Sequence, residues 1–511
     1  MVSKLAIISG IVLFSSIALY LNIQEEQKGK NIRRRVIVIG AGLAGFSASI
    51  EAYNQGSEVI LIEKEPRVGG NSAKASSGIN AVDSETQKKS HSKDSLDLYI
   101  NDTLRSGDGL SSLVLVNKLT KDSADAINFL TQKGVNLDVL SQCGGHSQPR
   151  THRSIPREDG KPENVGFTII KTLHEYTKKN TNITILTGIE VIDLLTNKKK
   201  EVIGIKYKNL TSGDEKELFG EGIVLTTGGW GADRSTGSLL NEYREDLLEI
   251  PTTNGGFTKG EGIKLARKIG AKLVHMDKVQ LHPTGFLNPS QPDSLSVFLA
   301  PEALRASGGI ILNTNGIRFV NELGRRDHVT NAILSQKNRF PPPNGKDPLK
   351  MPFIALLILN QEAADIFDPI MLGFYQKKGL VQPFENGQEL CDKIGIDPEV
   401  LKSTLEQYSD IANSKMEDPF GKKVFPVKSF KFEEKLYLIY ITPVVHYCMG
   451  GISFNEKTQV LDLNDQPIPN LFAAGEVTGG LHGQNRLAGN SLAECVVFGR
   501  EAGKNAGLGI K

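Results

Sequence analysis

The sequence predicts an α/β fold with a Rossmann-like, doubly wound parallel sheet, and three observations near the start of the chain support this. Residues 36–39 (VIVI) are a continuous β-branched apolar run, as in strands buried on both faces of a parallel sheet. A helix-compatible stretch follows at residues 46–53, and a second apolar strand at 58–62 ends at an acid, Glu63. Between the first strand and the helix stand the glycines of a GxGxxG pattern: Gly40, Gly42 and Gly45.

Strand, glycines, helix, strand and acid in this order form a complete βαβ unit that is typical of dinucleotide binding. Gly40 is expected to make the tight turn, and Gly42 to let the backbone approach a pyrophosphate. Gly45 is expected to let helix and strand pack closely, and Glu63 to accept hydrogen bonds from a ribose diol. The other residues predicted to contact the cofactor here are Ala41, Leu43, Ala44 and Lys64.

Length and composition limit the number of domains and the kinds of partner that the chain can have. A chain of 511 residues exceeds the size of one hydrophobic core, so we expect two or three domains, or one large domain with an insertion. The formal net charge of +2 gives no field that would attract nucleic acid. The 52 glycines are about a tenth of the chain, against a typical ~7%, which indicates many positions of positive φ or close backbone approach.

The cysteines exclude several kinds of redox and metal site. The chain has only Cys143, Cys391, Cys448 and Cys495, which lie far apart, and it has no CxxC motif. A disulfide framework, a four-cysteine iron–sulfur cluster, a CxxCH haem and a thiolate zinc site are therefore not expected. We expect no metal site, and redox chemistry here must use an organic cofactor.

Residues 5–23 form an uncharged apolar run that is long enough to cross a bilayer core of ~30 Å at ~1.5 Å per residue. The run ends without a clear A-x-A cleavage site, so residues 1–30 are interpreted as an uncleaved signal anchor and linker. The basic residues after it favour a cytoplasmic position for the rest of the chain, whereas sequons at Asn101, Asn182 and Asn209 permit a lumenal one. The expected location is the endoplasmic reticulum, with the mitochondrion as the alternative.

A second glycine-rich segment, residues 69–80 (GGNSAKASSGIN), follows the βαβ unit. Small residues at this density suit a chain that passes close to an extended cofactor and leaves backbone N–H groups free to donate. The predicted cofactor contacts in it are Gly69, Gly70, Asn71, Ser72, Ser76, Ser77, Gly78, Ile79 and Asn80.

This segment resembles the flavin-contacting segment of the fumarate reductase and succinate dehydrogenase flavoprotein family, especially its soluble single-chain fungal fumarate reductases. Residues 144–153 (GGHSQPRTHR), 224–229 (VLTTGG) and 471–476 (LFAAGE) are similar to other motifs of that family, in the family's order. The resemblance runs from about residue 33 to the C-terminus and implies that the cofactor is FAD. It adds these contacts: Gly145, Gly229, Gly475, Glu476, Ser491 and Leu492.

The resemblance also implies a domain organisation and an activity. An FAD-binding domain, residues 31–276 and 447–511, would be interrupted by an inserted α+β capping domain at 277–446. The implied reaction is the reduction of fumarate to succinate by hydride transfer from reduced FAD, which would reoxidise reduced flavin or NADH under low oxygen.

Within the family's active-site blocks, His282, His446 and Arg486 would clamp the substrate carboxylates, with His282 also among the catalytic residues. Arg326 would deliver the proton, and Glu302 with Arg305 would relay it from solvent. Asp327 is expected to orient Arg326.

Two departures from bacterial relatives, Pro301 before Glu302 and Tyr447 after His446, leave other substrates open. The alternatives are a flavoenzyme for another unsaturated or amino dicarboxylate, similar to L-aspartate oxidase, and a flavin-binding protein without turnover. The last class would have no reason to keep Arg326 and Glu302 together.

Membrane-bound relatives attach FAD through a histidine in the segment that corresponds to residues 72–78, and this chain has none there. The FAD is therefore predicted to be non-covalent. Without clusters or haems, we expect no iron–sulfur or haem subunit, and electrons should come from a diffusible reduced flavin (FMNH2 or FADH2) or another soluble donor.

We therefore expect acid precipitation of the purified protein to release its flavin. The yellow colour should pass into the supernatant, because no histidine of residues 72–78 can hold it covalently. The measurement is the absorbance of supernatant and pellet, and flavin that stays with the pellet would refute the prediction.

Overall fold

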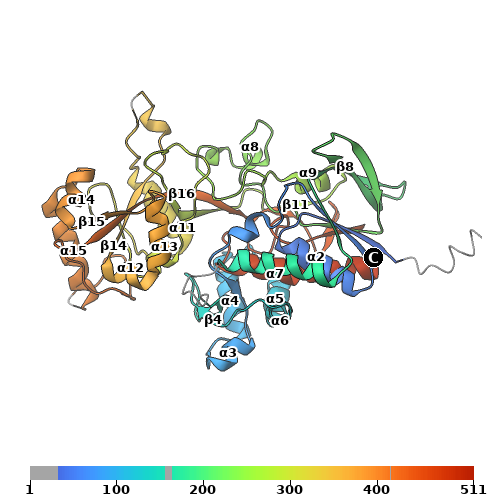
Figure 1. The fold of residues 1–511 in the computed structure, drawn as a ribbon, viewed down its shortest axis with the longest axis horizontal. Helices are drawn as coiled ribbons and strands as arrows, with labels where there is room; N and C mark the ends of the chain where they lie inside the picture. The colour runs from blue at the N-terminus through green and yellow to red at the C-terminus, as the bar shows by residue number, and fades with distance from the viewer. Residues whose placement is uncertain (1–32, 156–163, 344, 415, 511) are drawn as a thin grey trace, which may run out of the picture.

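Two lobes, joined by two long strands, make up the molecule (Figure 1). The computed structural model describes residues 33–155, 164–343, 345–414 and 416–510. The predicted signal anchor at residues 5–23 lies outside this part of the chain. Among the described residues, none of the helices combines the length and the apolar character that a membrane crossing requires.

A six-stranded sheet forms the centre of the larger lobe. Its strands are, in spatial order, β18 (Gln459–Leu461), β19 (Pro467–Ala473), β10 (Gly222–Leu225), β1 (Arg35–Ile39), β2 (Glu58–Glu63) and β6 (Thr184–Thr187). All neighbours pair in parallel except β18, which runs antiparallel to β19 at the edge. This confirms the doubly wound α/β fold predicted from the sequence.

The β-branched run of β1 is buried on both faces, as its composition predicts. Val36 and Val38 pack into one hydrophobic core, and Ile37 and Ile39 pack into a second core on the opposite face. The alternation of side chains along a strand thus divides four consecutive apolar residues between two layers.

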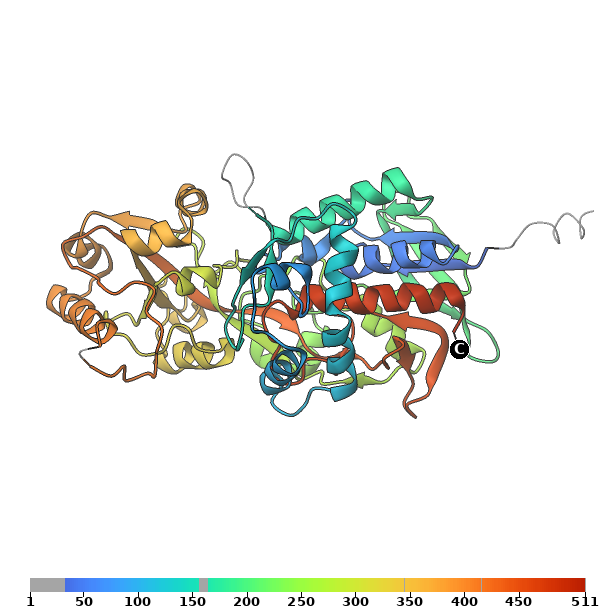
Figure 2. The same cartoon turned by 90° about the horizontal axis from the view of Figure 1, so that it is seen from below.

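Helices cover the first face of this sheet, and Figure 2 shows α2 and α16 side by side along it. The helices of this layer and the region beside it are α2 (Leu43–Asn54), α3 (Glu85–Lys89), α4 (Leu96–Ser106), α5 (Leu113–Lys121), α6 (Ser123–Thr131), α7 (Val165–Asn180) and α16 (Asn490–Leu508). The second face is covered by an antiparallel sheet of β7 (Ile189–Thr196), β8 (Val202–Asn209) and β9 (Glu215–Phe219), with α8 (Leu239–Tyr243) and α9 (Glu261–Lys268).

The turn between β1 and α2 depends on two glycines. Gly40 has φ +104°, and a Cβ atom on it would lie 2.5 Å from the carbonyl oxygen of Thr226 in the segment after β10. A Cβ atom on Gly45, in the first turn of α2, would lie 1.9 Å from the carbonyl oxygen of Gly40. The tight turn and the close packing predicted for these residues are therefore required sterically.

The smaller lobe is an antiparallel sheet with helices packed around it. The sheet order is β12 (Val279–Phe286), β16 (Leu436–Cys448), β14 (Ala355–Asn360) and β13 (Ile310–Leu312), and β15 (Gln382–Phe384) also pairs with β16. The helices are α10 (Ala303–Ala306), α11 (Arg326–Gln336), α12 (Gln361–Phe367), α13 (Pro369–Lys377), α14 (Gly387–Ile394) and α15 (Pro398–Ala412). This lobe is the α+β insertion that was expected.

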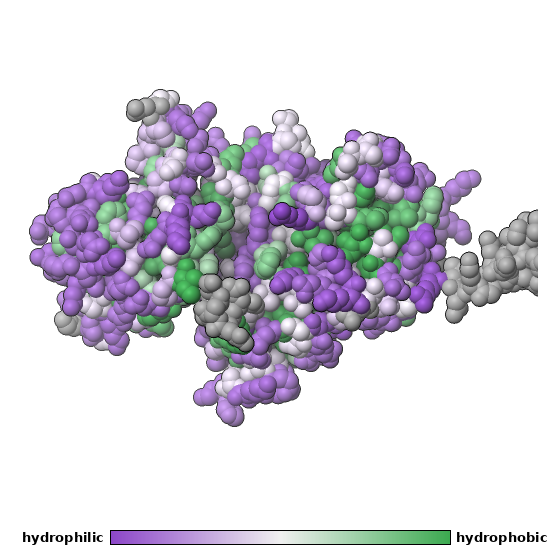
Figure 3. All heavy atoms as spheres, in the orientation of Figure 1, coloured by the Kyte–Doolittle hydropathy of each residue, from purple (hydrophilic) through white to green (hydrophobic). Residues whose placement is uncertain are grey.

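The remaining short elements belong to loops and small sheets: β3 (Ile79–Asn80), β4 (Val139–Ser141), β5 (Thr151–Arg153), β11 (Leu273–Val274), β17 (Gly451–Ile452) and three 3₁₀ turns at Gly70–Lys74, Glu245–Leu247 and Pro348–Lys350. The space-filling view shows a mainly hydrophilic surface over the smaller lobe, whereas apolar residues gather over part of the larger lobe (Figure 3).

Strands β12 and β16 connect the lobes. Val279 and Cys448, at one end of this antiparallel pair, belong to a core of the larger lobe, and Phe286 and Ile441, at the other end, belong to the core of the smaller lobe. Each of these two strands therefore begins in the hydrophobic core of one lobe and ends in that of the other. The domain limits placed at residues 276/277 and 446/447 stay predictions.

The steric requirement at Gly45 gives a stability test. Gly45→Ala should cost about 1–3 kcal/mol or more, because the new methyl meets a backbone carbonyl that cannot move without distorting the turn. Thermal unfolding and the FAD content of the purified protein are the readouts.

The control is Gly373→Ala, in the middle of α13, where a Cβ atom would meet nothing within 4 Å. This change should stabilise the protein by about 0.5–1 kcal/mol, because alanine is the better helix former. Equal effects of the two substitutions would contradict the packing described for α2.

Candidate active site

Polar side chains from both lobes face one another at the antiparallel pair of β12 and β16, where these strands pass from one lobe to the other. His282 lies on β12 and His446 on β16, and their ring centroids are 5.2 Å apart. Arg326 is the first residue of α11, and Glu302 immediately precedes α10. Arg486 comes from the loop before α16. The structure therefore brings together the residues that the sequence predicted to hold substrate and move a proton.

Gln280 joins two of these residues, and sequence reasoning missed it. Its Oε1 accepts hydrogen bonds from Arg326 Nη1 at 3.0 Å and from Arg486 Nη2 at 3.1 Å. Its Nε2 donates to Asn485 Oδ1 at 2.7 Å and to the carbonyl oxygen of Arg486 at 2.8 Å. One buried amide therefore fixes two guanidinium groups. The signal in the sequence was weak: Gln280 stands two residues before His282, and so on the same face of a strand.

Arg326, Glu302 and Arg305 form a chain of charged groups. Arg326 donates to Glu302 Oε2 from Nε at 3.3 Å and from Nη2 at 3.0 Å. The other carboxylate oxygen, Glu302 Oε1, lies 3.5 Å from Arg305 Nη2. The three residues predicted to relay a proton are thus in contact in the predicted order.

The prediction that Asp327 orients Arg326 is wrong. Asp327 pairs with Arg325, whose Nε and Nη2 lie 3.1 Å and 2.6 Å from its two carboxylate oxygens. Neighbouring residues at the start of a helix point in different directions, so Arg326 turns inward to Glu302 while Arg325 and Asp327 stay half exposed.

Burial and neighbouring charges set the protonation states. Burial raises the pKa of Glu302, but the positive charges of Arg326 and Arg305 outweigh this and lower it to about 2. Desolvation, together with the charge of Arg326, lowers the pKa of Arg486 to about 9. Desolvation also lowers the pKa of His282 and of His446 well below 6.5. At neutral pH the site therefore holds an ionised Glu302, a charged Arg486 and neutral imidazoles.

The hydrogen bonds of His282 assign its tautomer. Its Nδ1 accepts the backbone N–H of Thr284 at 3.2 Å, so the proton of the neutral ring is on Nε2. That Nε2 is buried without a hydrogen-bond partner among the described residues. His446 is held by its Nδ1, which lies 2.8 Å from Thr253 Oγ1.

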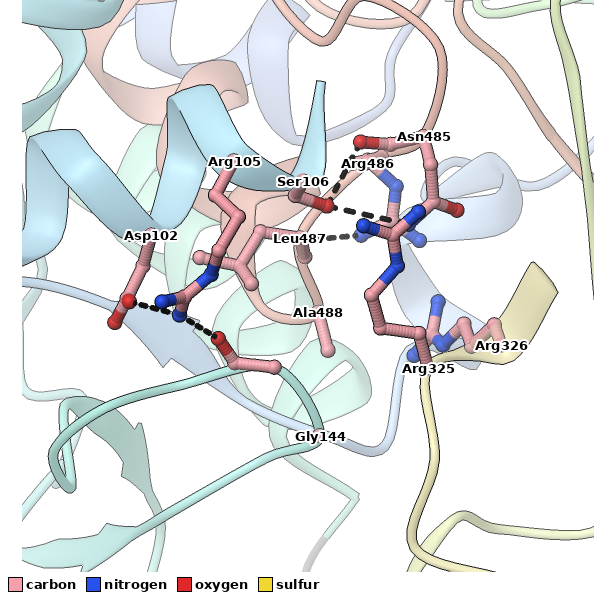
Figure 4. Close-up of a pocket in the computed structure, with 11 residues that line it drawn as sticks. Asp102, Arg105, Ser106, Gly144, Arg325, Arg326, Asn485, Arg486, Leu487 and Ala488 are labelled. Atoms are coloured by element: carbon pink, nitrogen blue, oxygen red, sulfur yellow. Dashed lines mark hydrogen bonds and ion pairs between the residues drawn. The ribbon is translucent and has the colours of Figure 1, made fainter. Parts of the chain in front are cut away.

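Other donors in the site are also buried without a hydrogen-bond partner: Arg305 Nε and Nη2, and Arg486 Nε. A buried polar group left unsatisfied costs about 1–3 kcal/mol, so Arg486 Nε and His282 Nε2 point to a ligand that supplies oxygen acceptors, whereas Arg305 Nη2 faces Glu302 Oε1. Figure 4 shows Arg325, Arg326 and Arg486 gathered on one side of a pocket and Arg105 on the other. A small molecule with two carboxylates matches this set of donors.

The 144–153 segment contributes a wall of the pocket, which Gly144 and Gly145 line. A Cβ atom on Gly144 would lie 2.6 Å from Glu302 Oε1, so only glycine lets the loop approach the relay carboxylate this closely. Arg150 is fully buried and anchors the loop through ion pairs of 2.7 Å to Asp94 and to Asp102. Burial lowers the pKa of His146 to about 4, and its Nε2 lies 2.9 Å from the carbonyl oxygen of Ala488.

The residues predicted to bind FAD line the adjacent end of the central sheet and fit the cofactor. Gly42 precedes α2 and gives no side-chain cap, so the positive end of the helix dipole faces the turn where a pyrophosphate would bind. Glu63 points into the same turn and accepts the backbone N–H of Ala41 at 2.8 Å. Ser72 Oγ accepts the backbone N–H of Leu43 at 3.2 Å.

Other predicted FAD contacts have structural partners as well. The Asn71 amide bonds to Asn254 Oδ1 at 2.7 Å and to Gly255 N at 2.9 Å, and Asn254 was not predicted. The side-chain amide of Asn80 holds the carbonyl oxygen of Ala488 at 2.7 Å. The ammonium group of Lys64 is taken up by the carbonyl oxygen of Phe257 and by Glu261, so any contact of Lys64 with the cofactor is through its backbone.

Two late segments complete the FAD region. Glu476 is packed against Gly229 and accepts the backbone N–H of Cys448 at 2.9 Å, and burial raises its pKa to about 7. Helix α16 begins after Gly489 without a side-chain cap, which places the uncapped N–H groups of Ser491 and Leu492 at its start. The contacts assigned to individual residues stay predictions. In the part of the chain that the structure describes, no group of three or more His, Cys, Asp or Glu residues could hold a metal ion.

Comparisons with known proteins agree with this arrangement. A family model described as an FAD binding domain matches residues 35–492. The chain is 38% identical over 476 residues to the fumarate reductase of Schizosaccharomyces pombe, which covers 92% of this chain and 89% of that protein. It is 39% identical over 485 residues to fumarate reductase 1 of Saccharomyces cerevisiae, with coverage of 92% and 98%. A solved structure, the open conformation of a flavocytochrome c3 fumarate reductase, covers 95% of this chain and 80% of its own, with a TM-score of 0.75 and 32% identity.

The shared acceptor at Gln280 gives a binding test. Gln280→Glu places a negative charge between Arg326 and Arg486, and it should weaken the binding of a small dicarboxylate such as succinate by about 10- to 100-fold, since charge-assisted hydrogen bonds contribute about 1.5–3 kcal/mol. The measurement is titration of the flavin absorbance with succinate.

Gln132→Glu, which adds the same charge at an exposed position beyond α6, is the control and should bind like the wild type. An unchanged dissociation constant for Gln280→Glu would mean that Arg486 does not hold the ligand.

Proposed function

The chain belongs to the family of FAD-binding flavoproteins, and from this premise we propose how its site works. The protein is an FAD-dependent oxidoreductase that reduces fumarate to succinate, as its similarity to fungal fumarate reductases supports. The observation that carries the mechanism is the cluster of buried donors without partners around Gln280.

The glycine turn before α2, Glu63 and the start of α16 would hold the FAD. When bound and reduced, FAD supplies a hydride to one carbon of the fumarate double bond. The chain's own residues must then bind the two carboxylates, stabilise the charge that develops on the other carbon, and protonate that carbon.

Arg486 and His282 are suited to hold the carboxylates. Arg486 Nε and the Nε2 proton of His282 are buried donors that lack partners, and each matches a carboxylate oxygen. His446, on the neighbouring strand β16, lies beside His282 and forms the adjacent part of the wall of the site. Because the donors come from both lobes, they hold the substrate with its two ends in fixed directions, which favours attack at one carbon.

Arg326 is suited to deliver the proton. An arginine ordinarily keeps its proton, since a guanidinium group is a very weak acid. Here the acceptor is a developing carbanion, a strong base that would lie among buried side chains. Glu302 is ionised at rest and lies between Arg326 and Arg305, so as Arg326 gives up its proton Glu302 can take one from Arg305 and pass it to Arg326. Arg305 is then reprotonated from solvent. Burial lowers the pKa of Arg305, which eases its part in the transfer.

An oxidase acting on an amino dicarboxylate, as L-aspartate oxidase does, is not favoured. Such an enzyme has no need for a proton donor beside the reacting carbon, whereas this chain brings Arg326, Glu302 and Arg305 into contact. The similar proteins of both yeasts are fumarate reductases.

For the electron donor we propose a diffusible reduced flavin, FMNH2 or FADH2, or another soluble reductant. The support is in the sequence, which has no haem-attachment motif and no cysteine cluster to connect the FAD with a membrane quinone. The reaction would then reoxidise reduced flavin, and through it NADH, when oxygen is low.

Location and attachment are proposed from the N-terminal sequence alone. The apolar run at residues 5–23 would anchor the protein to a membrane, with the endoplasmic reticulum preferred over the mitochondrion. The catalytic part begins after it, at β1.

A chain that starts near Asn31 should therefore be soluble, bind FAD and reduce fumarate at the full-length rate, because removal of the first 30 residues deletes none of the core residues of β1 and its neighbours. Fractionation of cells that express the two forms tests the anchor, since only the full-length form should sediment with membranes. Aggregation of the shortened chain without bound flavin would show that the segment belongs to the fold.

The proton donor is tested with pre-reduced enzyme that is mixed anaerobically with fumarate. Arg326→Ala should lower kcat by at least about 10²-fold, the lower end of the range for proton delivery, while fumarate still perturbs the flavin spectrum at similar concentrations. Arg326→Lys keeps the charge but not the reach and shape of the guanidinium, so it should recover little.

Arg325→Ala is the matched control, because its guanidinium pairs with Asp327 and not with Glu302. It should cost less than about tenfold in kcat, as expected for a group outside the relay. Near-normal turnover in Arg326→Ala would overturn the assignment.

A further inference from the structure

A cluster of buried charged residues in the smaller lobe lies behind the proton relay. We call it the cap ion cluster, and it consists of Arg318, Glu322, Asp418 and Lys422. All four side chains are at most 6% exposed. Within the described residues, the four side chains bond to one another and to neighbouring backbone, and not to Arg486, His282 or His446.

Glu322 is the centre of the cluster. Its carboxylate accepts from Arg318 Nε at 2.8 Å and Arg318 Nη2 at 3.1 Å, from Lys422 Nζ at 3.0 Å, and from the backbone N–H of Ile311 at 3.3 Å. Lys422 is 100 residues away in the chain. Taking one partner out of a buried ion pair is costly, whereas the intact pair contributes little stability in comparison with apolar residues. A role in placing neighbouring groups therefore accounts better for such a cluster than stability does.

The loop at residues 321–325 links Glu322 to the relay. Arg305 Nη1 donates to the carbonyl oxygen of Glu322 and, at 3.5 Å, to that of Gly324. With Nη1 held by this loop, Nη2 of Arg305 is directed to Glu302 Oε1, which lies 3.5 Å away. The same loop ends at Arg326, the first residue of α11. Both arginines of the relay thus take their positions from one short segment, which the Glu322 carboxylate ties to the core.

We propose that Glu322 is a positioning residue for proton delivery, acting through the carbonyl groups of the 321–325 loop on Arg305 and through the end of that loop on Arg326. This inference rests on the proposed roles of these two arginines. Glu322 does not contact substrate, and its loss should act on the proton step and not on the binding of fumarate.

Asp418 provides a matched control within the cluster. It is as buried as Glu322, and it accepts from Arg318 Nη1 at 3.0 Å and from the backbone N–H of Lys422 at 2.7 Å. In the described part of the chain, the Asp418 carboxylate bonds to Arg318 and to the backbone of Lys422, and to no residue of the 321–325 loop. Removal of either carboxylate unbalances the same cluster, but only one of them releases the loop.

The experiment compares full-length, FAD-loaded Glu322→Ala and Asp418→Ala, with rates expressed per bound FAD. For Glu322→Ala we expect kcat to fall at least about tenfold, since small misplacements of a reacting group can cost up to about 100-fold, with KM for fumarate within about twofold of the wild type. The solvent deuterium isotope effect on kcat should rise, as proton transfer becomes more rate-limiting. Asp418→Ala should lower the melting temperature by a similar amount but keep both kcat and the isotope effect.

Glu322→Gln is the second variant and keeps the test valid if Glu322→Ala does not retain FAD. It preserves the side-chain volume and one acceptor oxygen, so kcat should lie between those of Glu322→Ala and the wild type, and below that of Asp418→Asn. If the Glu322 and Asp418 variants lose stability to a similar degree and turn over at the wild-type rate, Glu322 is structural and the proposal is wrong. Failure of the wild-type enzyme to reduce fumarate would be a different result, since it would reject the proposed function and not the positioning role.

Discussion

The site depends on one electrostatic constraint: Arg305, Arg326 and Arg486 are buried close together, and among the described residues Glu302 is the only one whose carboxylate touches any of them. Such an excess of buried positive charge is unfavourable in the absence of a ligand. Gln280 lessens the cost, because its single amide oxygen is shared by two of the guanidinium groups. The remaining donors are left for the substrate, so a dianion completes the site where a neutral molecule cannot.

This constraint explains why the chain needs two lobes. Arg486 is attached to the larger lobe, through the loop before α16, whereas Arg305 and Arg326 belong to helices of the smaller lobe. Strands β12 and β16 bring the lobes together and carry Gln280, His282 and His446 at the crossing. The 144–153 loop closes the site against Glu302, and buried ion pairs beneath it fix its position. The residues that bind substrate are thus held by rigid elements on every side, as preorganised catalysis requires.

Much of the fold could be predicted because local patterns determine it. The apolar run of β1, the glycines and the acid of β2 lie within residues 35–63, and their spacing alone defines a βαβ unit. The catalytic residues were found through resemblance, which identified Glu302 and Arg326 but not how they meet. Gln280 was missed because an amide carries no chemical signal by itself. No role was predicted for Glu322, because its partner Lys422 is far away in the chain. Asp327 was misassigned because sequence proximity does not tell which way a side chain at a helix start points.

The most direct test of the account measures how strongly the site requires a ligand with two negative charges. Calorimetric titration of the oxidised, FAD-loaded enzyme with fumarate and with its monomethyl ester varies one carboxylate and little else. The second carboxylate should be worth about 1.5–3 kcal/mol, as in other charge-assisted contacts, so fumarate should bind about 10- to 100-fold more tightly. Equal affinities for the dianion and the monoanion would contradict the account, because they would mean that the buried arginines are already satisfied without the substrate.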